Sequence, residues 1–332
     1  MGKFCVGIDL GGTFIKFALL DRQMQIAASM QVPTPAAGAD AVIDAMAAGA
    51  LELMRRQSVD KGDVAALGIG SPGPLDLEAG VVLALPNIPG FENVALRDRV
   101  GGKVGLPAVL ENDANAAGLG EYLRGGGKGA RIMVLLTLGT GVGSGIVIDG
   151  VVLHGAHGIG AEVGHMIVCP GGEPCGCGQK GCLERYSSAT YLARLARRAV
   201  EQGHRGVPKA EVSALGSPSS LSETLASKGD IDARDVEQAW RAGDELGAQI
   251  WEQAMHYLGV ACVNLARTLD PDLIVLGGGM ARAGDALLEP VRRHFRALHW
   301  TVAEPKTEIV LARLGNDAGV IGAAGVAWEK YG

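Results

Sequence analysis

The sequence predicts an α/β protein built as two lobes. At 332 residues the chain exceeds the size at which one core usually stops growing. Aromatic residues make up only 4% of it and glycine occurs 51 times, which is typical of sheets and helices of Val, Ile, Leu and Ala joined by tight turns. A strand, a glycine-rich turn and a second strand occur near residue 4 and again near residue 131. Each lobe is therefore expected to contain a β-meander of the same kind.

The first part of the chain reads strand, strand, strand, helix, strand. Two β-rich runs flank a Gly-Gly pair within residues 4–21, and a third run covers 26–32. Helical spacing of Ala, Leu and Met predicts a helix over 39–56, followed by a short buried strand over 64–70. A strand at 108–110 and an Ala-rich helix at 112–123 complete this part. The glycine-rich segment 125–129 is the candidate boundary between lobes.

The second part repeats the hairpin and then becomes helical. Strands are predicted at 131–138 and 144–149 around a turn at 139–143, and 157–184 is a Gly- and Cys-rich loop. Helical patterns dominate 189–269, and buried strands follow at 273–276 and 308–311. The closing helix at 318–330 is expected to pack back on the first lobe. The predicted lobes are therefore 1–124 with 313–332, and 125–312.

Charge and hydropathy exclude several classes of protein. The net charge is −6, with 30 basic and 36 acidic residues intermixed, so there is no broad positive field for nucleic acid. The first residues lack the basic start and apolar stretch of a signal peptide, and no apolar run approaches the ~20 residues that cross a bilayer. We expect a cytoplasmic protein with no nucleic-acid or membrane partner.

Two turns are candidate phosphate-binding sites. Asp9-Leu-Gly11-Gly12-Thr13 places a carboxylate at a strand end and two glycines after it, with Lys16 nearby. Backbone N–H groups in such a turn can approach an anion, with Asp9 holding Mg²⁺ through water. The alternative is an ordinary Gly-Gly hairpin with a solvated Asp. The matching second turn is Gly139-Thr140-Gly141, and the pair could clamp a triphosphate from two sides. Neither turn has the pattern of a dinucleotide fingerprint or a P-loop.

Two further strand ends are candidates for a role in the site. Gly277-Gly278 follows a buried strand and could let an adenosine lie on the backbone, or could simply end the strand. Glu111-Asn112-Asp113 lies where a strand meets a helix. Asn112 and Asp113 could be no more than helix caps. In the catalytic interpretation, Asp113 accepts the proton of a hydroxyl that attacks a γ-phosphoryl group.

The most specific pattern is a set of metal ligands. His165, Cys175, Cys177 and Cys182 offer one imidazole and three thiolates, a closed tetrahedral set for structural zinc. Reduced cysteines in a flexible loop are the alternative. Glu162 and Glu184 flank this set, and zinc would fix them and His165 as a rim that recognises a polyol. Asn87 could reach the same sugar, although an Asn between prolines is ordinarily a turn residue.

Read together, five motifs resemble the ROK family of bacterial glucokinases, related sugar kinases and sugar-responsive repressors. They are Asp9-Leu-Gly-Gly-Thr13 with Lys16, Glu111-Asn-Asp-Ala-Asn115, Leu138-Gly-Thr-Gly-Val-Gly143, Glu162-Val-Gly-His165 and Cys175-Gly-Cys-Gly-Gln-Lys-Gly-Cys-Leu-Glu184. The resemblance covers nearly the whole chain. It implies the two-lobed actin, hexokinase and Hsp70 fold (ribonuclease H-like), with the active site in the cleft between the lobes.

The resemblance also implies ligands and roles. ATP and Mg²⁺ are expected at Gly12, Thr13, Thr140 and Gly141, and Asp113 is expected to act as the base. Zinc is expected at His165, Cys175, Cys177 and Cys182. Family members suggest a homodimer. The expected sugar contacts are Asn112, Asp113, Glu162, His165 and Glu184.

The implied activity is transfer of the ATP γ-phosphoryl group to the 6-hydroxyl of glucose. Leu85-Pro-Asn-Ile-Pro-Gly-Phe91 is similar to the sugar loop of glucokinases. The alternatives are fructose, mannose, N-acetylglucosamine or N-acetylmannosamine as the substrate, or a non-catalytic sugar sensor. A DNA-binding repressor would need a helix-turn-helix ahead of Asp9, where we expect no room for one.

Overall fold

The computed structural model describes residues 2–85, 88–202 and 219–332. The chain divides into two compact units. One comprises Met1–Leu135, Gly145–Ala161 and Ala312–Gly332, and the other comprises Leu136–Ser144 and Glu162–Leu311.

The first unit is built on a five-stranded sheet. Its strands are β1 (Phe4–Leu10), β2 (Phe14–Asp21), β3 (Ile26–Pro33), β4 (Val64–Ser71) and β8 (Ala108–Asn112), in the order β3-β2-β1-β4-β8. The first three form the predicted antiparallel meander, whereas β4 runs parallel to both β1 and β8. The carboxyl ends of β1, β4 and β8 therefore meet at one edge of the sheet.

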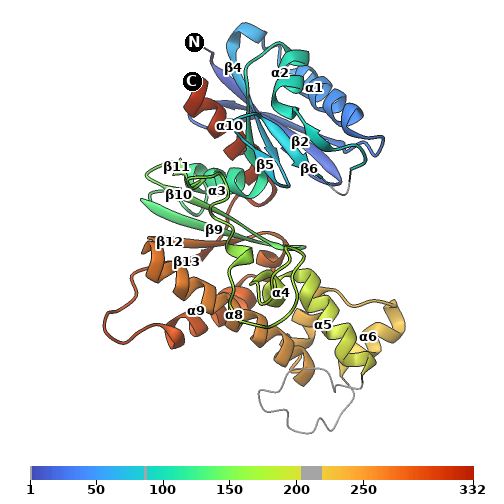
Figure 1. Ribbon diagram of the computed structural model, residues 1–332, viewed down its shortest axis with the longest axis vertical. Helices are drawn as coiled ribbons and strands as arrows, with labels where there is room; N and C mark the ends of the chain where they lie inside the picture. The colour runs from blue at the N-terminus through green and yellow to red at the C-terminus, as the bar shows by residue number, and fades with distance from the viewer. Residues whose placement is uncertain (1, 86–87, 203–218) are drawn as a thin grey trace. The chain divides into compact units, whose positions relative to one another are not determined.

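Helices cover both faces of this sheet (Figure 1). Helices α1 (Ala39–Arg56) and α2 (Leu96–Val104) close the larger hydrophobic core on one face. On the other face α10 (Ala318–Tyr331) packs against β1, β4 and α3 (Asp113–Arg124). The predictions for α1 and for the return of the last helix to the first part of the chain are thus confirmed.

Glycine allows α10 to lie directly on the sheet. A Cβ at Gly68 of β4 would stand 1.7 Å from the carbonyl oxygen of Ala323, and one at Gly322 would stand 1.6 Å from that of Ala116 in α3. Backbone therefore meets backbone at these crossings, which fixes α10 closely against the sheet and against α3.

Shorter elements complete this unit. A small antiparallel sheet contains β5 (Leu75–Asp76), β6 (Val81–Ala84) and β7 (Glu92–Val94), and the three-ten turns are η1 (Lys61–Asp63) and η4 (Gly315–Asp317).

The second sheet has the order β11-β10-β9-β12-β13. Its strands are β9 (Ile132–Leu138), β10 (Val142–Ile148), β11 (Val151–Val152), β12 (Leu273–Gly277) and β13 (Glu308–Leu311). Strand β12 runs parallel to β13, and β11 runs antiparallel to β10.

Strands β12 and β13 and the turn between β9 and β10 belong to the second unit, and the rest of that unit is mainly helical. The 25-residue helix α8 (Glu245–Leu269) is its central helix and contacts α4 (Glu184–Ser187), α5 (Ala189–Glu201), α7 (Ala233–Arg241) and α9 (Asp285–Leu298). Helix α6 (Ser220–Lys228) packs on α5 and α7, and η2 (Val163–His165) and η3 (Gly279–Ala283) are three-ten turns. Among the described residues, no helix combines the length and the apolar character that a membrane span requires.

Candidate active site

The turn between β1 and β2 carries the first set of predicted phosphate contacts. Asp9 and Lys16 are paired across the two strands, with Lys16 Nζ 3.6 Å from Asp9 Oδ2. Burial raises the pKa of the Asp9 carboxyl, and the nearby Lys16 charge opposes that rise. The N–H of Gly11 donates to the carbonyl of Phe14, which closes the turn. Helix α10 begins directly beside this carboxylate, because a Cβ at Gly319 would stand 2.9 Å from Asp9 Oδ2.

Gly11 and Gly12 of this turn have different roles: Gly11 allows the hairpin to close, and Gly12 leaves its backbone open to a ligand. A Cβ at Gly11 would lie 2.9 Å from the Phe14 carbonyl oxygen, so the closure of the hairpin itself excludes a side chain. A Cβ at Gly12 would meet nothing within 4 Å. The backbone of Gly12 and the exposed Thr13 are therefore open to a ligand, as a phosphate-binding turn requires.

The junction of β8 and α3 holds the predicted base. The side chain of Asn112 is the helix cap: its Oδ1 accepts hydrogen bonds from the backbone N–H groups of Ala114 at 3.0 Å and Asn115 at 3.2 Å. Asp113 is the first helical residue, and its Oδ1 accepts from the N–H of Ala114 at 2.8 Å. The capping role suggested for the pair thus belongs to Asn112, and Asp113 stands at the helix N-terminus, where the backbone dipoles favour a carboxylate.

Sheet register brings Asp9 and Asp113 to the same edge. Asp9 pairs with Gly70 of β4, and Gly70 pairs with Glu111 of β8. Two strand spacings of about 4.8 Å place the backbones of Asp9 and Glu111 about 10 Å apart. Gly70 lies between them, and a Cβ there would come within 3.9 Å of the Asp113 Cα. The phosphate turn and the predicted base are therefore neighbours within the first unit.

The turn between β9 and β10 is the counterpart in the second unit. The N–H of Gly139 donates to the carbonyl of Gly141 at 3.0 Å, and the Gly139 carbonyl accepts from the N–H of Ala189 at the start of α5. A Cβ at Gly141 would stand 2.8 Å from Glu184 Oε2. Thr140, between the two glycines, is exposed. Predicted phosphate and sugar residues thus meet at this turn.

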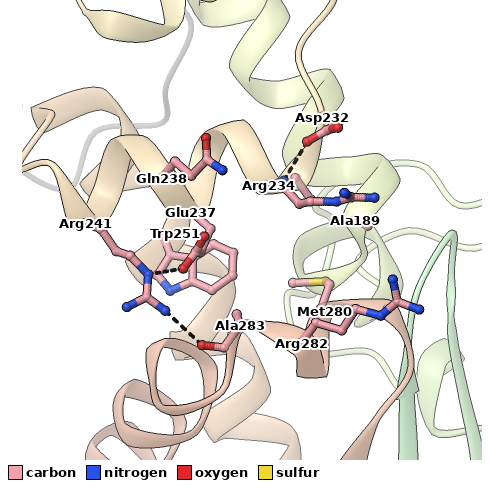
Figure 2. Close-up of a pocket in the computed structure, with 12 residues that line it drawn as sticks. Ala189, Asp232, Arg234, Glu237, Gln238, Arg241, Trp251, Met280, Arg282 and Ala283 are labelled. Atoms are coloured by element: carbon pink, nitrogen blue, oxygen red, sulfur yellow. Dashed lines mark hydrogen bonds and ion pairs between the residues drawn. The ribbon is translucent and has the colours of Figure 1, made fainter. Parts of the chain in front are cut away.

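The strand end at Gly277 and Gly278 lies beside the same turn. Gly278 has φ +80°, and a Cβ there would lie 2.5 Å from the Leu138 carbonyl oxygen, one residue before Gly139. Beyond Gly278, a cavity of about 630 Å³ opens between α7, η3 and the side chain of Trp251 (Figure 2). Its walls include Arg234 and Gln238 on α7, and Met280 and Arg282 on η3.

The four predicted metal ligands converge in the second unit. One ligand atom from each of His165, Cys175, Cys177 and Cys182 lies within 4.8 Å of the others. Cys175 Sγ is 3.6 Å from His165 Nδ1, and Cys177 Sγ is 3.6 Å from Cys182 Sγ. Bonds of about 2.3 Å to a tetrahedral zinc would separate its ligand atoms by about 3.7 Å, so this donor set fits the ion.

The pKa values of the three thiols determine which of them must lose a proton when a metal binds. Burial raises the pKa of the Cys175 thiol to about 12 and also raises that of Cys182. A backbone hydrogen bond from Gln179 lowers the pKa of the exposed Cys177. Metal binding must therefore displace protons from the two buried thiols, while Cys177 offers the readiest thiolate.

The predicted sugar residues of the second unit surround this cluster. Glu184 Oε1 is 3.1 Å from Cys175 Sγ, and the carbonyl of Glu162 accepts from the N–H of His165 at 3.0 Å. Glu162 is exposed, whereas His165 and Glu184 are half-buried. Glu184 is thus held at the thiol of Cys175, and Glu162 directly precedes the turn that carries His165. Asn87 lies outside the described residues.

Comparisons with known proteins identify the family of this chain. The model of the ROK family matches residues 5–330. The chain belongs to the ROK family. A glucokinase of Halalkalibacterium halodurans is 39% identical over 322 residues, covering 96% of this chain and 93% of that protein.

Two solved structures of ROK proteins cover almost all of the chain. The ROK hexokinase of Thermus thermophilus has a TM-score of 0.80 at 35% identity, covering 98% of each chain. A ROK family glucokinase of Streptomyces griseus in complex with glucose and AMPPNP has a TM-score of 0.77 at 34% identity, covering 98% of this chain and 99% of that one. The predicted two-lobed fold of the actin and hexokinase type is thus confirmed.

Several residues of this ROK protein's site were not found from sequence. Gly319 lies beside Asp9 from the far end of the chain, and α7 lines the cavity beyond Gly278. His154, after β11, contacts Glu111. Each of these residues is far in sequence from the residue or cavity it contacts, so only the fold brings them together. A glycine at the start of the closing helix was the one local signal, since glycine there permits close approach.

Proposed function

We propose that this ROK protein is an ATP-dependent glucose kinase that transfers the γ-phosphoryl group to the 6-hydroxyl of the sugar. The observation that carries the proposal is the placement of Asp113 at the N-terminus of α3, on the same sheet edge as the phosphate turn at Asp9. The likeness to glucokinases over almost the whole chain supports the reaction and the choice of sugar.

Asp113 is proposed as the general base. The helix N-terminus favours its ionised form, and the capping of α3 by Asn112 holds it in place. The carboxylate takes the proton of the sugar hydroxyl as the oxygen attacks the γ-phosphorus and the bond to the leaving ADP breaks. A carboxylate is suited to this role because the transition state for phosphoryl transfer needs a positioned acceptor rather than a strong base.

ATP is proposed to bind at the two glycine turns. The open backbone at Gly12, with exposed Thr13 and Thr140, supplies N–H and hydroxyl donors for phosphate oxygens. Asp9 would hold Mg²⁺ through water, and the ion would neutralise charge on the phosphates. The cavity beyond Gly278 has the size of a nucleoside site and arginine side chains at its wall, which supports adenosine binding there.

The Cys and His cluster is proposed as a structural zinc site. All four coordination positions come from the protein, so the ion would shape the loop rather than activate water. Through Cys175 and His165 it would hold Glu162 and Glu184 as a rim for sugar hydroxyls. Asn112, Asp113 and His165 complete the proposed sugar contacts, with Asn87 as a further candidate.

The test is ADP release from ATP and Mg²⁺ with glucose, fructose, mannose, N-acetylglucosamine and N-acetylmannosamine. We expect glucose to give the highest kcat/KM. Preference for another sugar would keep the base, the phosphate turns and the zinc site but refute the choice of substrate. If the folded, zinc-loaded protein bound glucose but released no ADP with any sugar, the kinase proposal would fail and a sugar sensor would replace it.

A further inference from the structure

Glu111, the residue before Asn112 and Asp113, has a buried carboxylate whose two oxygens are both engaged. Its side chain is 2% exposed. Oε1 accepts from the N–H of Asn112 at 2.8 Å and from Asn115 Nδ2 at 3.1 Å, so it grips the turn on both sides of Asp113. A carboxylate removed from water in this way is retained only if its remaining oxygen also has a partner.

That partner is His154, on the segment that follows β11. Its Nε2 lies 2.8 Å from Glu111 Oε2, and its side chain is 37% exposed. Glu111 faces the ring directly, and Glu329 of α10 is the other charged group acting on it. The hydrogen bond to Glu111 raises the pKa of His154, so the ion pair of imidazolium and carboxylate persists to higher pH than it would for an ordinary histidine.

We propose that His154 is a positioning residue for catalysis, which acts through Glu111 to hold the turn that presents Asp113. The inference rests on the proposed function, because it assigns its effect to the reaction at Asp113. His154 is 41 residues from Asp113 in sequence, and the Glu111 carboxylate connects the two through the Asn residues on either side of Asp113.

The physical reason is the cost of leaving Glu111 Oε2 unpaired. Without His154 the carboxylate would turn toward water and release Asn112 and Asn115, since a buried charge without its partner is strongly unfavourable. The first turn of α3 would then loosen around Asp113. Misplacement of a reacting group by about 1 Å can lower a rate by about 100-fold without any change in the groups present.

The experiment compares His154→Leu, which removes the donor, with His154→Gln, which can still donate to Glu111. His157→Leu is the matched control, because His157 is exposed on the same segment. We expect His154→Leu to lower kcat by about 10- to 100-fold with KM for ATP changed by less than about twofold. The Gln variant should recover most of that loss, and His157→Leu should match the wild type.

The pH dependence of kcat distinguishes a specific role of His154 from a non-specific loosening of the fold. The ion pair is present below the raised pKa of His154 and is lost as pH rises through it. A neutral imidazole can still donate its Nε2–H to Glu111, so wild-type kcat should decline through this pKa only to about the level of His154→Gln. The decline should be absent from His154→Gln, which does not titrate. Equal loss of kcat in the Leu and Gln variants, or an unchanged alkaline decline in Gln, would overturn the proposal.

Hydrogen exchange tests the same contact without relying on activity. Amides of residues 112–116 should exchange faster in His154→Leu than in His154→Gln or the wild type, with α1 unchanged. If the wild type phosphorylates glucose and His154→Leu is normal in kcat and exchange, this inference alone is refuted. If the wild type phosphorylates no sugar, the proposed function is refuted and the catalytic role of His154 falls with it.

Discussion

The loop at residues 157–184, which carries the proposed zinc ligands, and the junction of β8 and α3 hold polar side chains in opposite ways. Among its described residues the loop has only one three-ten turn, the first residue of α4 and two isolated β-bridges, Ile167 with Cys182 and Pro174 with Lys180. Backbone hydrogen bonds such as that from the N–H of Val168 to the carbonyl of Gly181 close its turns, and four of its side chains converge on one point. The junction instead continues a buried strand, is capped by Asn112, and is held by the Glu111 carboxylate.

This difference indicates that the loop and the junction are made rigid by different interactions. We expect the loop to gain rigidity from a metal cross-link that the chain cannot supply alone, because thiolates attract each other only through a cation. A segment beside the core is fixed by hydrogen bonds that cost little once the strand is buried. Changes at the junction should therefore affect the chemical step, and changes at the loop should affect sugar binding.

The largest expected effect is that of Asp113→Asn. The amide keeps the shape of the side chain but cannot take the proton, so kcat should fall by about 10²- to 10⁴-fold with glucose binding largely kept. Steady-state kinetics and calorimetric glucose titration measure the two quantities. Asp44→Asn is the control, because Asp44 is an exposed residue of α1 that forms an ion pair with Lys103. Near-normal kcat in Asp113→Asn would exclude Asp113 as the base.

The next largest effect is expected in the loop, where Cys177→Ser should impair glucose binding rather than the chemical step. Cys177 is exposed, so the change removes a proposed ligand without opening a cavity. We expect zinc content to drop and KM for glucose to rise by about 10- to 100-fold, with the rest of the fold intact by circular dichroism. Cys169→Ser, in the same loop but outside the four ligands, should retain zinc. A zinc-free protein with wild-type KM would remove the metal from the account of sugar binding.

Two neighbouring glycines, Gly278 and Gly279, differ in whether the structure leaves room for a side chain. Gly278→Ala would place a Cβ 2.5 Å from the Leu138 carbonyl at φ +80°, whereas Gly279→Ala meets nothing within 4 Å. We expect the first to lower the free energy of unfolding by about 1–3 kcal/mol and the second to change it little. Urea unfolding measures both. Equal stability of the two variants would show that the strand end adjusts more freely than its contacts indicate.

The smallest effect tests the phosphate turn. Gly12→Ala should leave the urea midpoint unchanged, because no atom lies within 4 Å of the added Cβ. It should raise KM for ATP several-fold if the backbone of Gly12 approaches a phosphate. Gly62→Ala, equally open but in the three-ten turn η1, is the control and should leave KM for ATP unchanged. An unaltered KM in Gly12→Ala would move the phosphate contact away from that residue.

Local pattern was sufficient for much of the fold. The helix at 39–56 was predicted with the bounds it has, because Ala, Leu and Met recur at helical spacing between a glycine and a turn. Strand β10 begins at Val142, two residues before its predicted start, because the turn that precedes it is tighter than the glycines suggested. The hairpins and the closing helix followed from glycine position and hydrophobic period in the same way.

The sequence by itself determined which residues are candidates for the chemistry: the four proposed zinc ligands, the glycine turns and the proposed base Asp113 all stand in short motifs whose spacing limits what they can do. Tertiary structure alone decided which of them meet. Sheet order sets Asp9 about 10 Å from Glu111 through Gly70, α10 returns to place Gly319 against Asp9, and His154 reaches Glu111 across 43 residues. Those contacts join segments distant in sequence, and their positions depend on how the whole core packs rather than on any local preference.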